Sequence, residues 1–251
     1  MQADTAAPLA LIQGAGKRRA QGDSVFELEV PDLRIAPGEL VAVAGDSGCG
    51  KSTLLDMLAL VMEPTRMERF EMRFEPDDAP VDVRSLWRSG GETALAALRR
   101  DYLGYVLQTG GLLPFLDVAA NIGLPSRIKG LPEPGVALDA LAERLGLAGC
   151  LRRMPDALSI GQRQRVAILR ALMHQPRLVL ADEPTAAVDK ARAGRIMADF
   201  HTLARERGVA VVIVTHDLDL VRSLADRTYG FRMERVSEHE TRSLCFLETE
   251  R

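Results

Sequence analysis

The segment GDSGCGKST at residues 45–53 constrains the fold of this chain more than any other feature of the sequence. It follows the apolar run LVAVA at residues 40–44, which has the length and composition of a buried β-strand. The residues after it carry the apolar spacing of one helix face, at Leu54, Met57, Leu58 and Val61. The chain therefore passes from a buried strand through a glycine-rich turn into a helix, which predicts an α/β fold.

Four positions of this turn, Gly45, Gly50, Lys51 and Ser52, fit the pattern G-x-x-x-x-G-K-[ST] of a phosphate-binding loop. Glycines let backbone N–H groups converge on phosphate oxygens, and the following helix adds its positive end. The Lys51 ammonium can reach the outer phosphates, and the Ser52 hydroxyl can bind Mg²⁺. We expect the whole turn to contact a nucleotide, through Gly45, Asp46, Ser47, Gly48, Cys49, Gly50, Lys51, Ser52 and Thr53.

Two further apolar runs, at residues 178–181 and 209–215, have the character of buried strands, and helical periods lie between the predicted strands. Strands that alternate with helices predict a doubly wound sheet, with ligands at the carboxyl ends of the strands. The Gly- and Pro-rich stretch 110–134 and the helical pattern of 136–155 predict an inserted helical lobe. The charged stretch 63–99 predicts peripheral strands and loops, so we expect one domain with lobes.

Two adjacent carboxylates, Asp182 and Glu183, directly follow the predicted strand 178–181. In isolation they could form a solvated acidic turn, but a phosphate-binding loop needs partners of this kind. Asp182 would hold Mg²⁺ directly or through water, and Glu183 would polarise the water that attacks the γ-phosphate. The pair predicts nucleotide hydrolysis.

The segment LSIGQRQR at residues 158–165 has Ser159 and Gln162 in the spacing of a capping box. This spacing predicts the start of an amphipathic helix. Because the N-terminus of a helix also attracts anions, the same segment can face a phosphate.

Three cysteines, Cys49, Cys150 and Cys245, are an odd number at wide spacing. This pattern supports neither a disulfide framework nor a zinc site, and it indicates a reducing compartment. Cys49 stands beside Lys51 and a predicted helix N-terminus, a setting that favours the thiolate. We expect the Cys49 thiol to be reactive and bound nucleotide to block that reactivity.

Composition predicts a soluble globular chain. It has 251 residues, of which 47% are hydrophobic, and we find no apolar run of the roughly 18 residues that a membrane helix needs. The N-terminal residues do not follow the charge order of a secretory signal. Lys and Arg number 32 against 35 Asp and Glu, a net charge of −3, so we expect no nucleic acid partner.

Taken together, the order and spacing of six motifs resemble the ATP-binding subunit of ATP-binding cassette (ABC) transporters. GDSGCGKST is similar to the Walker A loop, LSIGQ to the family signature and LVLADEP to Walker B. YVLQTGG places Gln108 as the Q-loop glutamine, AAVD places Asp189 in the D-loop, and IVTHD places His216 as the switch histidine. LRRDYLGYVLQ and LLPFLDVAANIGLPSRIKG resemble the subgroup of lipoprotein-releasing, macrolide-efflux and cell-division ATPases.

The resemblance implies one ABC ATPase domain over residues 1–251, built on a RecA-like P-loop NTPase core of the α/β class. A peripheral antiparallel β-subdomain would occupy about 8–42 and 64–90, and an inserted α-helical subdomain about 110–170. The subunit would be cytoplasmic, peripheral on the inner face of the cell membrane, and would act on a separate membrane permease. The apolar segment 112–116 would dock this permease, unless it belongs to the core of the helical lobe.

The resemblance also implies a mechanism. ATP would lie between the Walker A loop of one copy and the signature of a second copy, so a homodimer suffices for two competent sites. Contacts across that interface would come from Ser159, Gly161, Gln162 and Asp189. Hydrolysis would use Glu183, His216 and Gln108, and Mg²⁺ would be bound by Ser52, Gln108 and Asp182.

Two other functions stay open at the level of sequence. The chain could regulate an extracytoplasmic partner through a membrane protein without moving cargo. It could also be an ABC ATPase of DNA repair, but those typically insert long coiled coils or zinc modules before the signature. Between Ser52 and Ser159 we find neither sustained heptads nor a CxxC motif.

Two positions depart from the family pattern. Ile160 replaces a glycine of the signature, and a β-branched residue restricts the backbone there. The aromatic residue that stacks on adenine in the family is missing near residues 20–22. Arg18, Arg19 or Phe26 could take its place, and we expect an arginine there to give weak selectivity for adenine.

Overall fold

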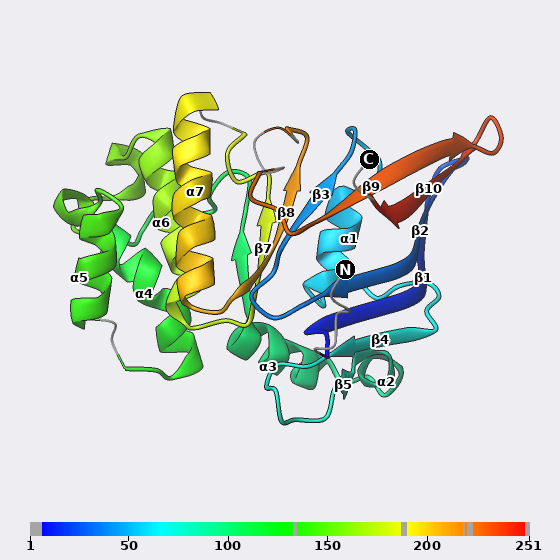
Figure 1. The fold of residues 1–251 in the computed structure, drawn as a ribbon, viewed down its shortest axis with the longest axis horizontal. Helices are drawn as coiled ribbons and strands as arrows, with labels where there is room; N and C mark the ends of the chain where they lie inside the picture. The colour runs from blue at the N-terminus through cyan, green and yellow to red at the C-terminus, as the bar shows by residue number, and fades with distance from the viewer. Residues whose placement is uncertain (1–6, 133–134, 187–189, 218, 220–222, 249–251) are drawn as a thin grey trace.

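The computed structural model describes residues 7–132, 135–186, 190–217, 219 and 223–248. Within these residues, ten strands join in one sheet (Figure 1). The strands are β1 (Ala10–Gln21), β2 (Ser24–Ile35), β3 (Leu40–Ala44), β4 (Arg69–Met72), β5 (Val81–Asp82), β6 (Leu103–Val106), β7 (Leu178–Asp182), β8 (Ala210–Thr215), β9 (Arg227–Arg235) and β10 (Glu240–Leu247). Their order across the sheet is β5-β4-β1-β2-β10-β9-β3-β8-β7-β6.

The half of the sheet that contains β3, β8, β7 and β6 is parallel. Its strands are almost wholly apolar because both faces are covered, and alternate residues of β3 belong to two separate hydrophobic clusters. The parallel register sets Ala44 opposite Thr215 and Asp182 opposite Val214. The turns that follow these three strands therefore lie along one edge of the sheet.

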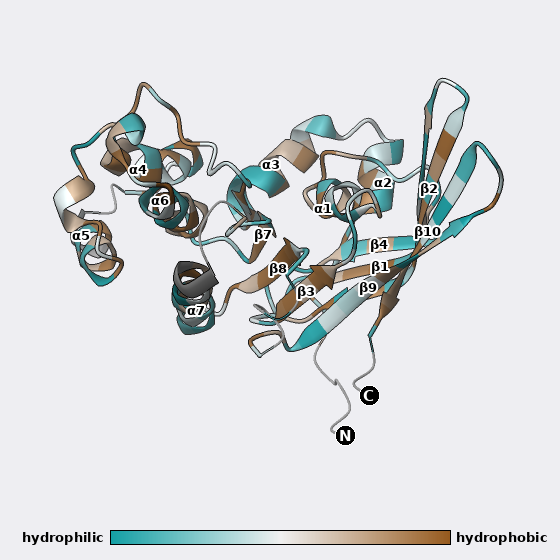
Figure 2. Cartoon of the chain, turned by 90° about the horizontal axis from the view of Figure 1, so that it is seen from above, coloured by the Kyte–Doolittle hydropathy of each residue, from teal (hydrophilic) through white to brown (hydrophobic). Residues whose placement is uncertain are grey.

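The other half of the sheet is built on hairpins. Strands β1 and β2 pair over almost their whole length, and β4 and β5 continue this antiparallel part. The C-terminal hairpin β9–β10 joins the two halves, because β9 runs parallel to β3 and β10 runs parallel to β2. Figure 2 shows the tips of the two long hairpins projecting side by side.

Helices flank this sheet. Within the described residues they are α1 (Lys51–Leu58), α2 (Val83–Arg88), α3 (Glu92–Tyr102), α4 (Val118–Lys129), α5 (Gly135–Arg144), α6 (Ile160–Met173) and α7 (Lys190–Glu206). Helices α4, α5 and α6 gather at one end of the molecule, and α7 packs beside α6 (Figure 1). Among the described helices, none combines the length and apolar content that a membrane crossing requires.

Two stretches differ from what the sequence predicts. The expectation of strands and loops over 63–99 is incomplete, because α2 and the start of α3 lie there beside β4 and β5. Each of these two helices buries a single residue, so their apolar period is weak in the sequence. The helical pattern of 136–155 is also shorter than its full range, because α5 ends at Arg144 and Gly146, which the sequence marks as the end of a helix, follows with a φ of 66°.

Candidate functional site

The glycine-rich turn lies between β3 and α1. Gly48 and Gly50 have left-handed backbone conformations, with φ of 81° and 108°, which residues with side chains rarely adopt. A side chain at position 50 would also be crowded, since a Cβ atom added to Gly50 would lie 3.2 Å from the ring of Phe26. The turn therefore depends on glycine, as a loop whose backbone approaches a ligand does.

The side chain of Lys51 is folded into this turn. The residue is only 7% exposed, and its Nζ donates hydrogen bonds to the carbonyl oxygens of Gly45 at 2.6 Å and Asp46 at 2.8 Å. The neighbouring Asp46, Ser47 and Gly48 are exposed. A fixed cation among exposed main-chain groups is suited to binding an anion.

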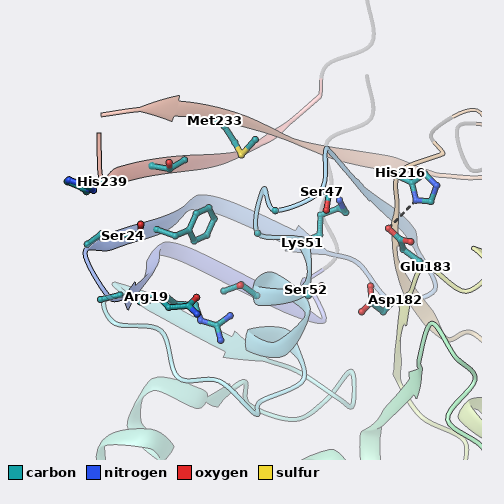
Figure 3. A pocket seen from close by; sticks show the side chains of 18 of the residues that line it. Arg19, Ser24, Ser47, Lys51, Ser52, Asp182, Glu183, His216, Met233 and His239 are labelled. Carbon is teal, nitrogen blue, oxygen red and sulfur yellow. Dashed lines mark ion pairs between the residues drawn. The ribbon is translucent and has the colours of Figure 1, made fainter. Parts of the chain in front are cut away.

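The turn opens on a cleft of about 1280 Å³. Figure 3 shows Lys51 and Ser52 on one side of it, with Asp182, Glu183 and His216 facing them from the ends of β7 and β8. Gln108, which follows β6, lines the same cleft. The site residues predicted from the sequence that lie together here are Ser47, Gly48, Gly50, Lys51, Ser52, Thr53, Gln108, Asp182, Glu183 and His216.

Two of these side chains, those of Gln108 and His216, meet at the carboxylate of Glu183. The Nε2 atom of Gln108 donates a hydrogen bond to its Oε2 at 3.2 Å, and the Nδ1 atom of His216 lies 3.1 Å from its Oε1 (Figure 3). The backbone of Glu183 has a φ of 43°, which is uncommon for a residue with a side chain. Strain of this kind costs about 1–3 kcal/mol and persists where the surrounding structure holds it.

Asp182 is the half-buried carboxylate at the end of β7. Burial raises its pKa, the charges of Glu183 and Asp56 raise it further, and the charge of Lys51 lowers it. No group of three His, Cys, Asp or Glu side chains among the described residues could hold a metal ion by itself. Mg²⁺ typically takes one or two protein oxygens and completes its shell with phosphates and water. Asp182 and the exposed Ser52 hydroxyl fit that donor set.

The comparisons with known proteins agree with this geometry. Residues 28–186 match the family model described as ABC transporter. The chain belongs to the ABC transporter family. Its fold also matches the ATP-binding cassette MJ0796, solved as a dimer bound to ADP and Pi, with a TM-score of 0.70 and 32% identity over 88% of this chain and 93% of that one. The chain is thus an ABC-type ATPase cassette, and the fold class predicted from the sequence is confirmed.

Curated relatives include export and lipoprotein-releasing proteins. The macrolide export ATP-binding/permease protein MacB of Sodalis glossinidius is 40% identical over 86% of this chain, but only 32% of that protein is covered. The lipoprotein-releasing system ATP-binding protein LolD 1 of Rhodospirillum rubrum is 40% identical over 86% of this chain and 92% of its own length. The cassette therefore spans about a third of the MacB relatives and nearly all of LolD 1.

The signature of the cassette lies outside this cleft. Ser159 caps α6, accepting a hydrogen bond from the Gln162 N–H at 3.3 Å, while its own N–H donates to the Gln162 side chain at 2.9 Å. The predicted capping box is therefore present, and Ile160 beside it is 45% exposed. None of Ser159, Gly161 and Gln162 lines the cleft. Asp189 lies outside the described residues.

Two side chains of α6 that the sequence analysis missed position the Q-loop. The Nε2 atom of the buried Gln164 donates to the carbonyl oxygen of Gln108 at 3.0 Å. The guanidinium of Arg170 donates to the carbonyl oxygens of Gly110 at 2.8 Å and Gly111 at 2.7 Å. The second glutamine of the QRQR run and the helical spacing gave no signal of these contacts, since they depend on how α6 packs against β6.

The prediction of a reactive Cys49 is wrong. The residue is 1% exposed, and burial raises the pKa of its thiol more than the charge of Lys51 lowers it. Its side chain packs against the backbone of Gly45, since a Cβ atom added to Gly45 would lie only 2.7 Å from the Sγ atom of Cys49. Proximity to Lys51 in the sequence does not show on which side of the loop the thiol lies.

The C-terminal hairpin is the other part of the site that the sequence analysis missed. Met233, His239 and Thr241 line the cleft, and the buried Ser243 donates a hydrogen bond to the carbonyl oxygen of Cys49 at 2.6 Å. No motif marks these residues. Only the turn at residues 236–239, between two strand-like runs, could have pointed to a hairpin.

The segment 112–116, considered either as a docking surface or as core of the helical lobe, has one residue packed on the core and one exposed residue. Leu112 packs against the core cluster that includes α4 and α6, whereas Phe115 is 72% exposed. The buried Asn121 holds the segment, accepting from the N–H of Leu113 and donating to the carbonyl oxygens of Leu113 and Leu116. The exposed ring of Phe115 is therefore presented by a well-bonded loop.

Proposed function

We propose that two copies of this cassette close head to tail around two ATP molecules, and that the cycle of closure and hydrolysis drives a separate membrane subunit. One observation carries the proposal: Glu183 is held between Gln108 and His216 in the cleft of the Walker A loop, while Ser159 at the start of α6 lies outside that cleft. Each copy then offers one half of two nucleotide sites.

Within one copy, Lys51 and the amides of the turn hold the phosphates. Ser52, Asp182 and Gln108 would hold Mg²⁺, which neutralises charge on the phosphate oxygens when bound. Glu183 accepts a proton from the attacking water, and His216 and Gln108 fix the position of its carboxylate. The second copy contributes the N-terminus of α6, through Ser159, Gly161 and Gln162, together with Asp189.

The membrane subunit would dock at the edge between the sheet and the helical lobe. A groove of about 290 Å³ lies there, and its apolar lining includes Leu113, Leu124 and the exposed Ile128. Phe115 lies on the same loop as Leu113. A short amphipathic segment of the membrane subunit fits such a surface, and it would place the cassette on the inner face of the membrane.

We also propose the lobe boundaries of a single ABC ATPase domain. The antiparallel β-lobe takes about 8–42 and 64–90, where β1, β2, β4 and β5 lie, and the helical lobe takes about 110–170, where α4, α5 and most of α6 lie. The remainder forms the nucleotide-binding core.

Replacing Glu183 with Gln tests the proposed function. The variant should keep ATP binding, lose turnover by about 10² to 10⁴-fold because its general base is gone, and accumulate as an ATP-bound dimer. Size-exclusion chromatography with and without ATP measures the dimer, and phosphate release measures turnover. Glu234→Gln, on an exposed carboxylate of β9 outside the cleft, is the control. Near-normal hydrolysis in Glu183→Gln contradicts the proposal.

Phe115→Asp tests the docking surface. It should break co-purification with the membrane subunit, because a charge would enter an apolar contact, while the melting temperature Tm of the isolated chain stays unchanged. Val61→Asp places the same charge at another exposed apolar residue, away from the groove. Loss of a cooperative melt in Phe115→Asp would mean that the ring belongs to the core of the lobe.

A further inference from the structure

A row of side chains crosses three strands beside the Walker A loop. Phe26 on β2 pairs with Arg19 on β1 and with Thr241 on β10. Residues that pair in register project from the same face of a sheet, and all three line the cleft. We call Arg19, Phe26 and Thr241 the base shelf.

The Walker A loop lies between the shelf and the catalytic carboxylates, and the shelf is one cross-strand row beyond the loop. The adjacent row contains Leu28 and Ser243, and the loop packs on it, through the hydrogen bond from Ser243 to Cys49 and the close approach of Gly50 to Leu28. The shelf is the next row, two residues or about 7 Å along the strands. A group attached to phosphates in the loop and directed toward the hairpin tips passes over this shelf.

The shelf offers flat and polarisable surfaces. Arg19 is exposed and its guanidinium is planar, and the half-buried ring of Phe26 lies next to it. Met233 and His239 of the β9–β10 hairpin line the same part of the cleft (Figure 3). Within the described residues, neither tyrosine nor tryptophan lines the cleft. Purine rings stack on guanidinium planes, aromatic rings and thioethers.

Arg18 is separated from the shelf by the pleat of β1. Arg18 precedes Arg19 on β1, and its partner Glu27 follows Phe26 on β2. Because successive residues of a strand point to opposite faces, the side chain of Arg18 projects from the face opposite the shelf. Its N–H donates to the Thr65 hydroxyl at 3.0 Å, and neither Arg18 nor Glu27 lines the cleft. Of the two arginines considered from the sequence, only Arg19 is placed to meet a base.

We propose that the purine of ATP lies on the base shelf against Arg19 and Phe26, and that Met233 of the neighbouring row and His239 of the β9–β10 turn border it. The inference rests on the proposed binding of ATP in this cleft. Two hairpins thus replace a single stacking aromatic residue. Because stacking surfaces detect the face of a ring more than its edge, the site holds GTP nearly as well as ATP.

The test compares three ligands, MgATP, MgGTP and inorganic tripolyphosphate with Mg²⁺, by calorimetry on the full chain. Arg19→Ala should raise the Kd of both nucleotides about 5- to 150-fold, the loss expected for one base-stacking partner, and leave the Kd of tripolyphosphate within about twofold. Arg18→Ala, the matched control on the opposite face, should leave all three unchanged. Lys51→Ala should weaken all three.

Equal weakening of ATP and tripolyphosphate by Arg19→Ala would make Arg19 a phosphate ligand and overturn the shelf. So would a wild-type chain that binds ATP no more tightly than tripolyphosphate, although ATP binding itself would stand. A wild-type chain that binds neither ligand overturns the proposed function instead.

The C-terminal hairpin is tested separately. The double variant Met233→Ala/His239→Ala should raise the Kd for ATP by at least about threefold without changing that for tripolyphosphate, because only the base loses a contact. Val236→Ala, an exposed apolar residue of the same hairpin outside the cleft, is the control. Unchanged ATP affinity in the double variant would remove the hairpin from the base site.

Discussion

The two ends of the nucleotide cleft are built in different ways. At the proposed catalytic end, Asp182 is the last residue of β7, Glu183 follows it, and His216 follows the adjacent parallel strand β8, so their meeting is a consequence of strand order. At the other end, Phe26 and Thr241 meet only because β10 pairs with β2 in one particular register. Strand ends assemble the proposed catalytic groups, whereas cross-strand pairing assembles the proposed base shelf.

The two ends also differ in their effect on the stability of the folded protein. The catalytic end holds a carboxyl with a raised pKa and a glutamate with an uncommon backbone conformation. The shelf end holds exposed side chains at Arg19 and His239, which retain their contact with water. Stability is therefore given up for function at one end of the cleft only.

Asp182→Asn should produce the larger effect of the two variants that compare the two ends, because it should lower turnover while raising the melting temperature. Turnover should fall by at least about 10²-fold because the proposed metal-binding carboxylate is lost. Tm at pH 7 should rise by about 2 °C, a modest figure because the group is partly solvated. Burial raises the pKa of Asp182, so the penalty for its charge exists above the folded pKa and vanishes below the unfolded value near about 4.

The gain in Tm should accordingly shrink as the pH is lowered from 7 toward 4, as followed by thermal melts at several pH values. Asp23→Asn, on an exposed carboxyl in the β1–β2 turn, is the control and should give no gain. A Tm for Asp182→Asn that is equal to or below that of the wild type at pH 7 contradicts the idea that the catalytic end is strained.

Ser243→Ala should produce a smaller effect and test how firmly the two ends are joined. The variant leaves the buried carbonyl of Cys49 without its donor, a loss of about 1–3 kcal/mol. In a domain of this size that corresponds to a fall in Tm of roughly 2–12 °C. Tripolyphosphate should also bind a few-fold more weakly, since the loop loses its anchor on β10.

Ser223→Ala, at an exposed serine, provides the baseline for that measurement. If Ser243→Ala lowers Tm but leaves tripolyphosphate binding intact, then the hairpin stabilises the fold without holding the Walker A loop, and the two ends are independent.

The same contrast explains what the sequence could predict. The turn around Lys51 and the pair Asp182 and Glu183 were predictable, because each follows a buried apolar run and parallel strand ends share an edge. The role of Thr241 was not, because register between distant strands leaves no local pattern. The burial of Cys49 was not predictable for a related reason, since its thiol is covered by tertiary packing that the local sequence does not specify.

Helix α6 carries a consequence for how the parts of the molecule move together. Its first turn bears Ser159 and the signature, its middle holds Gln108 through Gln164, and Arg170 near its end fastens the Q-loop beside the apolar groove. A helix of 14 residues transmits a displacement along its length with little loss. On the proposed function, α6 therefore links the contact with a neighbouring copy, the Q-loop beside Glu183 and the proposed membrane contact through one rigid element.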